Sequence, residues 1–300
     1  MFEIAAFYKF VPLPDHEDLR DPLIRICDAN EVLGTVLLAS EGVNGTIAGS
    51  ASGVESVLDH LRSDSRLADL VTKHSQAEQP PFLRLKVRIK REIVSLGVGE
   101  VEAAGNTGHR VAPEDWNDLI AQPDVLVIDT RNDYEYAVGT FEGAVNPRTR
   151  SFTEFPDWIE SNRANVDKPK IAMFCTGGIR CEKASAYLRE QGFDDVYQLD
   201  GGILRYLETV PEADSSWEGE CYVFDRRVTV GHGLVPGDKE MCVNCDRVLG
   251  PDDRTEPGYI EGVCCAVCAS SITEDRRARF TERQHQINLA LARGTAHLGR

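Results

Sequence analysis

The most constraining feature of this sequence is a short apolar run that leads directly into a cysteine- and glycine-containing loop. Residues 171–174 are apolar, and a helical pattern that ends at Gly192 follows the loop. The loop itself consists of Cys175, Thr176, Gly177, Gly178, Ile179 and Arg180. A strand, a tight loop and a helix in this order place Cys175 at the carboxyl end of a strand, where α/β sheets bind their ligands. The chain around Cys175 is therefore predicted to be an α/β domain.

The loop is suited to holding a negative charge on the Cys175 sulfur. Gly177 and Gly178 allow the backbone to curl so that several N–H groups point at the sulfur. The N-terminus of the following helix and the guanidinium of Arg180 add positive charge on the same side. We therefore predict a lowered pKa for the Cys175 thiol and a stable thiolate or persulfide. The alternative for Arg180 is a structural role, in which it ties the loop to an acidic residue.

The length of the loop distinguishes between two kinds of chemistry. Four residues separate Cys175 from Arg180, whereas phosphatase loops of this type are one residue longer and hold a tetrahedral phosphate. The shorter ring suits a terminal sulfur better than a phosphate. Cys181 follows at the start of the helix, where it is either a resolving thiol or a packing residue. The catalytic candidates are Cys175, Arg180 and Cys181.

Strands alternate with helices on both sides of this loop. Buried strand patterns cover residues 125–129, 171–174 and 196–199. Because such alternation predicts a parallel sheet, we assign a parallel α/β domain to residues 110–212. Asp129 and Arg131 lie at the end of the first of these strands and are expected to form a buried structural ion pair.

The first hundred residues form a separate pattern of strands and helices. The expected strands cover residues 2–11, 32–39, 46–49 and 83–89. Helical apolar spacing covers residues 15–30, and Ser50 is placed to cap a second helix. The Asn-Gly pair at the end of the segment 41–45 predicts a hairpin turn. The order β-α-β-β-α-β is that of a ferredoxin-like sandwich, which we assign to residues 1–100.

The last strand of this domain carries cations at alternate positions. Arg84, Lys86, Arg88 and Lys90 are separated by single apolar residues. Since side chains alternate across a strand, all four cations share one face and the apolar residues point to the core. Such a stripe is suited to following the phosphates of a nucleic acid. The alternative is a solvated edge strand that its charges protect from further pairing.

Four of the nine cysteines have the spacing of a metal site. They form two Cys-x2-Cys pairs in the Cys-rich C-terminal region, residues 213–300, which ends in an Arg-rich helix and tail reaching Arg300. Two such pairs predict a tetrahedral, all-cysteine structural zinc site of the zinc-ribbon type. The alternatives are metal-free thiols and an iron–sulfur cluster. The expected ligands are Cys242, Cys245, Cys265 and Cys268.

The overall charge and the hydropathy pattern limit the partners of the chain. With 33 basic and 49 acidic residues the formal net charge is −16, so any nucleic-acid partner needs a local basic patch. No apolar run approaches the roughly 18 residues of a membrane helix, and no basic segment typical of a signal peptide precedes the first apolar stretch. We therefore expect a cytoplasmic protein without a membrane partner. No dinucleotide fingerprint is present, so no nucleotide cofactor is expected.

Several motifs resemble those of known families. One set is similar to a rhodanese domain and consists of Asp129-Thr130-Arg131, Tyr134-Glu135-Tyr136, the loop 175–180 and Asp200-Gly201-Gly202-Ile203. A second set resembles the oxygen-dependent tRNA wobble-uridine hydroxylase family and consists of the segment 174–184, Glu41-Gly42-Val43-Asn44-Gly45 and Trp217-Glu218-Gly219-Glu220-Cys221. The second resemblance is more specific because its motifs come from all three segments of the chain.

This second resemblance implies an enzyme that hydroxylates carbon 5 of the wobble uridine in the tRNA anticodon to 5-hydroxyuridine, with molecular oxygen as co-substrate. It carries over Cys175 as the active cysteine and a persulfide as its intermediate. One hypothesis is that Cys175 adds to carbon 6 of uracil and thereby activates carbon 5. Two alternatives are a rhodanese-type sulfurtransferase and a non-catalytic adaptor that binds tRNA or protein. The candidates for stacking an unpaired base are Trp217, Tyr222, Phe224 and Tyr259.

Overall fold

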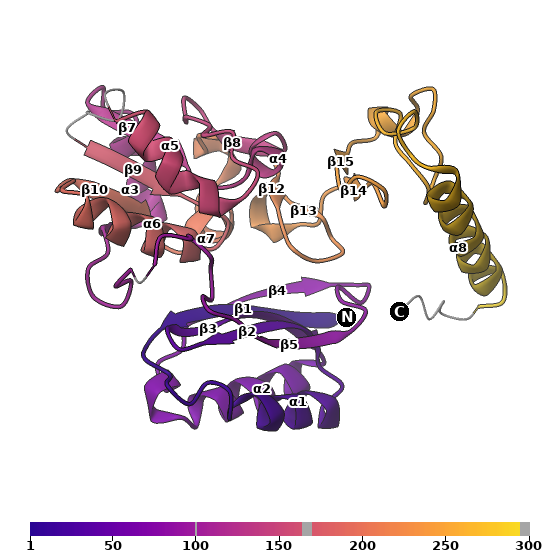
Figure 1. Ribbon diagram of the computed structural model, residues 1–300, viewed down its shortest axis with the longest axis horizontal. Coiled ribbons are helices and arrows are strands. Elements are labelled where there is room, and N and C mark those ends of the chain that lie inside the picture. The colour runs from indigo at the N-terminus through magenta and orange to yellow at the C-terminus, as the bar shows by residue number, and fades with distance from the viewer. Residues whose placement is uncertain (100, 164–169, 295–300) are drawn as a thin grey trace.

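The computed structural model describes residues 1–99, 101–163 and 170–294 and shows three regions (Figure 1). An antiparallel-rich sheet with two helices forms the N-terminal region, and a parallel sheet with flanking helices forms the central one. A segment of short hairpins followed by one long helix forms the C-terminal region. None of the helices in the described part of the chain has both the length and the apolar character needed to cross a membrane.

The N-terminal domain is a five-stranded sheet covered on one face by two helices. Its elements are β1 (Phe2–Phe10), α1 (Arg20–Ala29), β2 (Leu33–Ala39), β3 (Gly42–Gly49), α2 (Ala51–Arg62), the 3-10 helix η1 (Ser65–Leu67), β4 (Thr72–Ala77) and β5 (Leu85–Ile89). The strand order is β4-β1-β3-β2-β5, and the apolar sides of α1 and α2 pack on the sheet (Figure 1). Ser50 caps α2 as predicted, since its hydroxyl accepts a hydrogen bond from the Gly53 N–H at 3.1 Å.

The fourth strand of the ferredoxin-like order is not the segment that the sequence predicted. That place belongs to β4, which pairs antiparallel with β1, whereas β5 pairs in parallel with β2 and adds a fifth strand at the opposite edge. The sequence of β4, Thr-Lys-His-Ser-Gln-Ala, is almost entirely polar. Because an edge strand that lines a polar surface lacks apolar alternation, the usual strand signal is absent.

The hairpin between β2 and β3 also differs from the prediction. Ala39 pairs with Gly42, so the turn consists of Ser40 and Glu41, and Gly45 lies inside β3. The glycine at position 45 serves packing rather than turning. A Cβ atom there would lie 2.8 Å from the ring of Phe7.

The central domain is a four-stranded parallel sheet with apolar cores on both faces. Its elements are β6 (His109–Val111), α3 (Pro113–Ile120), β7 (Val125–Asp129), α4 (Asp133–Tyr136), β8 (Gly139–Phe141), η2 (Phe152–Glu154), α5 (Phe155–Ser161), β9 (Lys170–Phe174), α6 (Ile179–Glu190), β10 (Val196–Leu199), α7 (Gly202–Thr209) and η3 (Glu212–Asp214). The order is β6-β10-β9-β7, and every pairing in this sheet is parallel. The predicted parallel α/β architecture is confirmed.

The C-terminal region consists of three small sheets, two short 3-10 helices and one long helix. Its elements are β11 (Trp217–Gly219), β12 (Cys221–Tyr222), β13 (Thr229–Val230), η4 (His232–Leu234), β14 (Glu240–Met241), β15 (Val248–Leu249), η5 (Asp252–Arg254) and α8 (Glu274–Ala292). β11 pairs with β8 and so ties the region to the central domain. The predicted charged helix is α8, which buries none of its residues. Of the predicted Arg-rich tail, Arg300 lies outside the described residues.

Candidate functional site

Cys175 directly follows β9, and its residue is only 1% exposed. The Gly178 N–H donates a hydrogen bond to its sulfur at 3.1 Å, and the backbone and side chain of Cys181 donate two more. Burial raises the pKa of the Cys175 thiol, but these hydrogen bonds and the charge of Arg180 outweigh it and lower the pKa to about 5. Two of the predicted inward-facing amides, those of Gly178 and Cys181, therefore bind the sulfur, and the lowered pKa favours a thiolate at neutral pH.

The segment Asp200-Gly201-Gly202-Ile203 at the start of α7 explains how the Cys175 loop keeps this shape. The first N–H groups of α7 bind the carbonyls of the loop, Ile203 to Cys175 and Leu204 to Thr176, each at 3.0 Å. A Cβ atom on Gly202, which has a φ of +67°, would lie 2.5 Å from the Cys175 oxygen. Only glycine permits this approach. With the carbonyls turned toward α7, the amides of the loop are free to face the sulfur.

Arg180 is bound by an acidic residue within the protein. Its guanidinium forms a bidentate ion pair with Glu135 at 2.7 and 2.8 Å, and it also reaches the Thr176 hydroxyl at 3.2 Å. Glu135 is held in turn by the capping box at the start of α4. The contacts of Arg180 therefore agree with the alternative role, in which this residue ties the loop to an acidic residue. Its positive charge still lowers the pKa of Cys175.

Cys181 is fully buried at the start of α6 and lies beside the reactive sulfur. Burial raises the pKa of its thiol, and so does the hydrogen bond to Cys175. Cys181 is therefore a neutral S–H that donates to the Cys175 thiolate. Its sulfur also lies 3.6 Å from the Thr130 hydroxyl, which donates to the Phe174 carbonyl.

Asp129 and Arg131 form the buried ion pair that the sequence predicted. Their closest approach is 2.6 Å, and neither side chain is exposed. The Arg131 guanidinium lies 5.9 Å from the ring of Phe174 and 5.1 Å from that of Trp217. The pair thus braces the end of β7 against the strand that carries Cys175.

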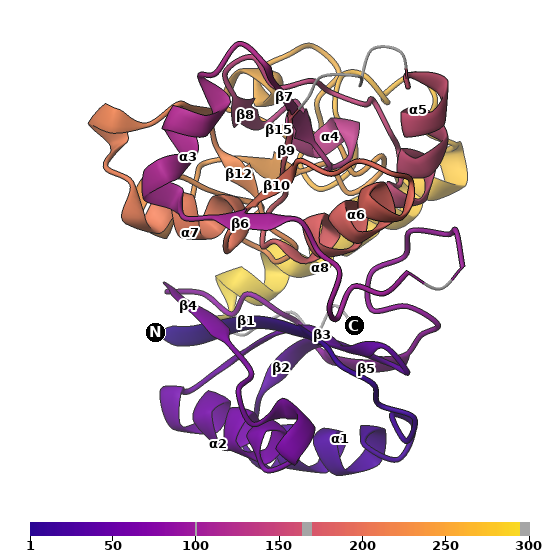
Figure 2. The same ribbon diagram turned by 90° about the vertical axis from the view of Figure 1, so that its left-hand side faces the viewer.

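The N-terminal domain covers the Cys175 loop with two residues that the sequence did not single out. Lys73 of β4 donates a hydrogen bond to the Gly177 carbonyl, and its ammonium group lies 5.5 Å from the centre of the Tyr8 ring. Tyr8 of β1 donates to Glu182 at 3.3 Å, and its hydroxyl occupies the space that a Cβ atom on Gly178 would need. In Figure 2, α6 and α7 lie directly above this sheet.

Lys73 is a half-buried charged group. Burial lowers its pKa to about 8, although the nearby charge of Cys175 acts in the opposite direction. Lys73 therefore remains mostly protonated at neutral pH. By reciprocity it stabilises the Cys175 thiolate.

Lys183 joins the two domains through a fully buried ammonium group. It binds Glu41 at 2.8 Å, Glu92 at 2.5 Å and the Val94 carbonyl at 3.0 Å. Glu41 belongs to the β2–β3 turn, and Lys183 belongs to the helix that follows the Cys175 loop. Two of the motifs in the family resemblance therefore meet at this contact, which fixes the position of the N-terminal domain over the loop.

Three aromatic rings lie beside this region. Tyr134 and Phe224 each contact Tyr222 edge-on with ring centres 5.2 Å apart, and the Arg180 guanidinium lies 5.9 Å from the Phe224 ring. Of the four aromatic candidates from the sequence, Phe224 is the exposed one, at 61%, whereas Trp217 and Tyr222 are buried and Tyr259 is half-buried. Phe224 is thus the most exposed of these rings next to the site, and Tyr134 is exposed at 37%.

The basic stripe lies at the β5 edge of the N-terminal sheet. The intervening apolar residues pack against the helix-side core, so the cations point to the face that also carries Tyr8 and Lys73. No acidic side chain of the described residues forms an ion pair with any of them. The stripe consists of Arg84, Lys86, Arg88 and Lys90.

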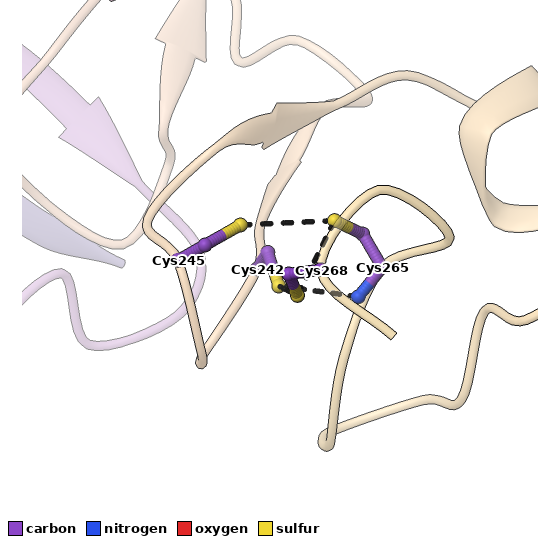
Figure 3. A group of neighbouring side chains, drawn as sticks. All are labelled: Cys242, Cys245, Cys265 and Cys268. Carbon is purple, nitrogen blue, oxygen red and sulfur yellow. Dashed lines mark hydrogen bonds between the residues drawn. The ribbon is translucent and has the colours of Figure 1, made fainter. Parts of the chain in front are cut away.

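The four predicted metal ligands come together in the C-terminal region (Figure 3). Three sulfur–sulfur distances are 3.6 to 3.7 Å, and all four sulfurs lie within 4.8 Å of one another. A tetrahedron with metal–sulfur bonds of about 2.3 Å has edges of about 3.8 Å. The cluster can therefore hold a metal ion, and Cys264 lies outside it, with its thiol directed to the Gly258 carbonyl. The cluster consists of Cys242, Cys245, Cys265 and Cys268.

Known proteins match both the parts and the whole of this chain. A family model described as a UPF0176 acylphosphatase like domain matches residues 2–93, and one described as a rhodanese-like domain matches residues 112–209. Over nearly full length, the chain is similar to proteins named tRNA uridine(34) hydroxylase. The protein of Brucella anthropi is 52% identical, covering 99% of this chain and 98% of the relative, and that of Agrobacterium fabrum is 54% identical, covering 100% and 95%. The protein of Acaryochloris marina is 52% identical, covering 99% and 96%. The chain belongs to the tRNA uridine(34) hydroxylase family.

Proposed function

We propose that this protein hydroxylates carbon 5 of the wobble uridine in the anticodon of tRNA, with molecular oxygen as the oxidant. The observation that carries the proposal is the environment of the buried Cys175 sulfur, which accepts a hydrogen bond from the Gly178 N–H at 3.1 Å and whose pKa the nearby Arg180 charge lowers. The full-length similarity to proteins named for this activity supports it. We place the reaction in the cytoplasm, where tRNA is the substrate.

The chemistry begins with the electron-rich sulfur, and the N-terminal domain must uncover the loop for the base to enter because Cys175 is only 1% exposed. The Cys175 sulfur adds to carbon 6 of uracil, and the electron pair of the 5,6 double bond moves onto carbon 5 and the 4-carbonyl oxygen. Carbon 5 then bonds to an oxygen atom from molecular oxygen. Loss of the carbon 5 proton and of the sulfur restores the double bond. The other oxygen atom leaves as water, with two electrons and two protons from an external two-electron reductant.

The side chains around the sulfur have distinct roles in this scheme. Cys181 and the Gly178 N–H stabilise the anion before addition and after release of the product. Arg180 and Glu135 hold the loop rigid, and Lys73 keeps a positive charge at the loop from the N-terminal side. The acting sulfur is either the thiolate or the outer sulfur of a persulfide, which intact-protein mass spectrometry distinguishes.

The two remaining sites serve binding and stability. The basic stripe is a local positive surface on a chain of net charge −16. We propose that it binds the phosphates of the anticodon region of tRNA. Phe224 offers a stacking surface beside the reactive loop. We assign structural zinc to the four-cysteine cluster, since four cysteine sulfurs fill a tetrahedral site and leave no position open for a substrate.

Mass spectrometry of tRNA nucleosides from a deletion strain tests the proposed activity. Complementation with the wild-type chain restores 5-hydroxyuridine, and complementation with Cys175→Ser does not. Full modification by Cys175→Ala, with tRNA binding intact, would instead identify a tRNA-binding adaptor. Unaltered tRNA in the deletion strain, together with rapid thiosulfate-dependent thiocyanate formation by the protein, would identify a sulfurtransferase.

Binding experiments at several salt concentrations test the basic stripe. Reversal of Lys86, Arg88 and Lys90 to Glu lowers tRNA affinity and flattens its dependence on salt, because fewer counterions are released. Arg88→Glu and Arg25→Glu form a matched pair, since Arg25 is an exposed arginine on the helix side of the domain. Equal affinity of these two variants contradicts the assignment.

A further inference from the structure

A cavity of about 500 Å³ lies away from Cys175, between the end of β4 and the β12–β13 hairpin. Figure 1 shows this hairpin above β4. Its size is in the range of small-ligand sites, and its lining is mainly apolar, with two guanidinium groups. The lining residues that matter here are Ala77, Gln79, Pro80, Pro81, Arg226 and Arg227.

Hydrogen bonds fix the two walls of the cavity relative to each other. Arg227 donates to the Ser75 hydroxyl of β4 at 2.9 Å and is held by Asp225 at 2.6 Å. The Arg226 N–H donates to the Pro81 carbonyl at 3.1 Å. The cavity is therefore preformed, and Arg227 is neutralised where it stands.

Arg226 differs from Arg227 in having a free guanidinium. Its side chain is exposed at the cavity, and no acidic group of the described residues forms an ion pair with it. Glu78 is the acidic residue that also lines the cavity. Flat proline surfaces beside an unpaired guanidinium plane are suited to the face of a nucleobase and to the phosphate attached to it.

The strand β4 connects this cavity to the reactive loop. Lys73, Ser75 and Ala77 lie on one face of β4, since side chains alternate along a strand. The first contacts the Cys175 loop, the second holds Arg227, and the third lines the cavity. Four residues of strand span about 13 Å, which exceeds the stacked spacing of about 3.4 Å between neighbouring nucleotides.

We propose that this cavity binds the base of one nucleotide adjacent to the target uridine, unstacked from it and turned toward Arg226. This inference rests on the proposed function, because it takes the uridine to be at Cys175. The two bases then lie near the two ends of β4. Because Arg227 covers the middle of this face at Ser75, the RNA backbone passes along the edge of β4, which splays the bases apart. Recognition of the neighbouring base adds to substrate choice at a position that the reaction itself does not touch.

Anticodon stem-loop RNAs with a single missing base test this assignment. The probes are the intact stem-loop, one with an abasic site before the target uridine and one with an abasic site after it. Each is measured for affinity and for 5-hydroxyuridine formation with the wild-type protein, Arg226→Ala and Gln79→Trp, which crowds the cavity from an exposed position. Arg25→Ala is the matched control.

We expect one of the two abasic sites to weaken wild-type binding about ten-fold and to have little further effect on Arg226→Ala or Gln79→Trp. Each of these variants alone binds the intact RNA about ten-fold more weakly, with the pKa of Cys175 unchanged. The cavity assignment is overturned if both abasic sites weaken binding equally in all proteins, or if both variants bind the intact RNA as the wild type does. In either case, hydroxylation of the intact RNA by the wild type still upholds the proposed function. Absence of wild-type binding and hydroxylation of the intact RNA overturns both.

Discussion

The molecule contains two cysteine sites whose surroundings act differently on the sulfur atoms. At Cys175 the protein supplies its own positive groups, and the thiol pKa is lowered to about 5 despite complete burial. In the C-terminal cluster the sulfurs mainly face one another. Desolvation and the neighbouring thiols raise the pKa of Cys245 to about 12, whereas hydrogen bonds outweigh burial at Cys268 and lower its pKa to about 7.

The difference shows what each site requires. An anion surrounded by fixed amides is stable without any added ion, and its lone pair remains available for chemistry. Four sulfurs within 4.8 Å of one another cannot all ionise unless a cation neutralises them. The first arrangement favours reactivity, and the second favours a structural metal.

Removal of the metal gives the largest expected contrast between the two sites. Structural zinc contributes on the order of 10 kcal/mol of binding free energy to small all-cysteine sites. We expect Cys242→Ser to release zinc and to unfold the segment around the cluster, because cysteines form most of its small core. Hydrogen exchange over the C-terminal region and zinc analysis measure this loss.

The matched control for this experiment is Cys264→Ser. Cys264 is equally buried but lies outside the cluster, so zinc content and exchange protection stay near wild-type values. The pKa of Cys175 is also expected to be unchanged in Cys242→Ser. Equal zinc loss in both variants contradicts the ligand assignment.

The stability of the Cys175 site has a defined pH dependence. The folded-state pKa of about 5 lies below the ordinary value of 9.0, so folding favours the thiolate. This stabilisation is complete above pH 9 and is lost as the pH falls through 5. Relative to Cys175→Ser, wild-type stability should rise by an amount on the order of several kcal/mol between these limits. Urea unfolding of both proteins across this range provides the measurement, and a constant difference contradicts a lowered pKa.

Arg180 permits a separation of structural and electrostatic effects. Arg180→Met leaves the Glu135 carboxylate buried without its partner and should cost about 3–5 kcal/mol. Adding Glu135→Gln removes the unpaired charge and restores part of that stability. The pKa of Cys175 should be higher than in the wild type in both the single and the double variant, because the guanidinium is absent from both. Thiolate absorbance, corrected with Cys175→Ser, measures this pKa. A pKa that returns to the wild-type value in the double variant would contradict the electrostatic role of Arg180.

The Cys175 loop and the cysteine cluster were predictable because their determinants are local in sequence. A strand, two glycines and a helix start specify the backbone amides that face the Cys175 sulfur. The Cys-x2-Cys spacing specifies which sulfurs of the cluster are neighbours. The same local logic identified the Asp129–Arg131 pair, whose members lie two residues apart. The loop context favoured Arg180 as a group that holds anionic substrate or sulfur, and an acidic partner was only the alternative; the identity of that partner, Glu135, depends on how α4 packs.

The contribution of the N-terminal domain was not predictable by this route. Lys73 lies 104 residues from Gly177 in the chain, and its strand lacks apolar alternation because it is polar on both faces. Tyr8 looked like an ordinary strand residue. Gly45 was assigned to a turn because an Asn-Gly pair is a common turn signal. The sequence does not show that the glycine is needed instead for close packing inside a strand. Such contacts depend on domain packing, which the Lys183 contact with Glu41 fixes.

Lys73→Met should produce the smallest measurable effect, a rise of the Cys175 pKa by roughly half a unit to one unit. The ammonium group is bound to the loop carbonyl of Gly177 rather than to the sulfur, so it acts through space. Thiolate absorbance against pH gives the shift. The matched control is Lys9→Met, which removes a lysine of β1 that binds Asp69 in the turn before β4. If the two variants titrate alike, the N-terminal domain covers the Cys175 site without tuning it, and the Cys181 thiol, the Arg180 charge and the backbone amides of the loop account for its difference from the cysteine cluster.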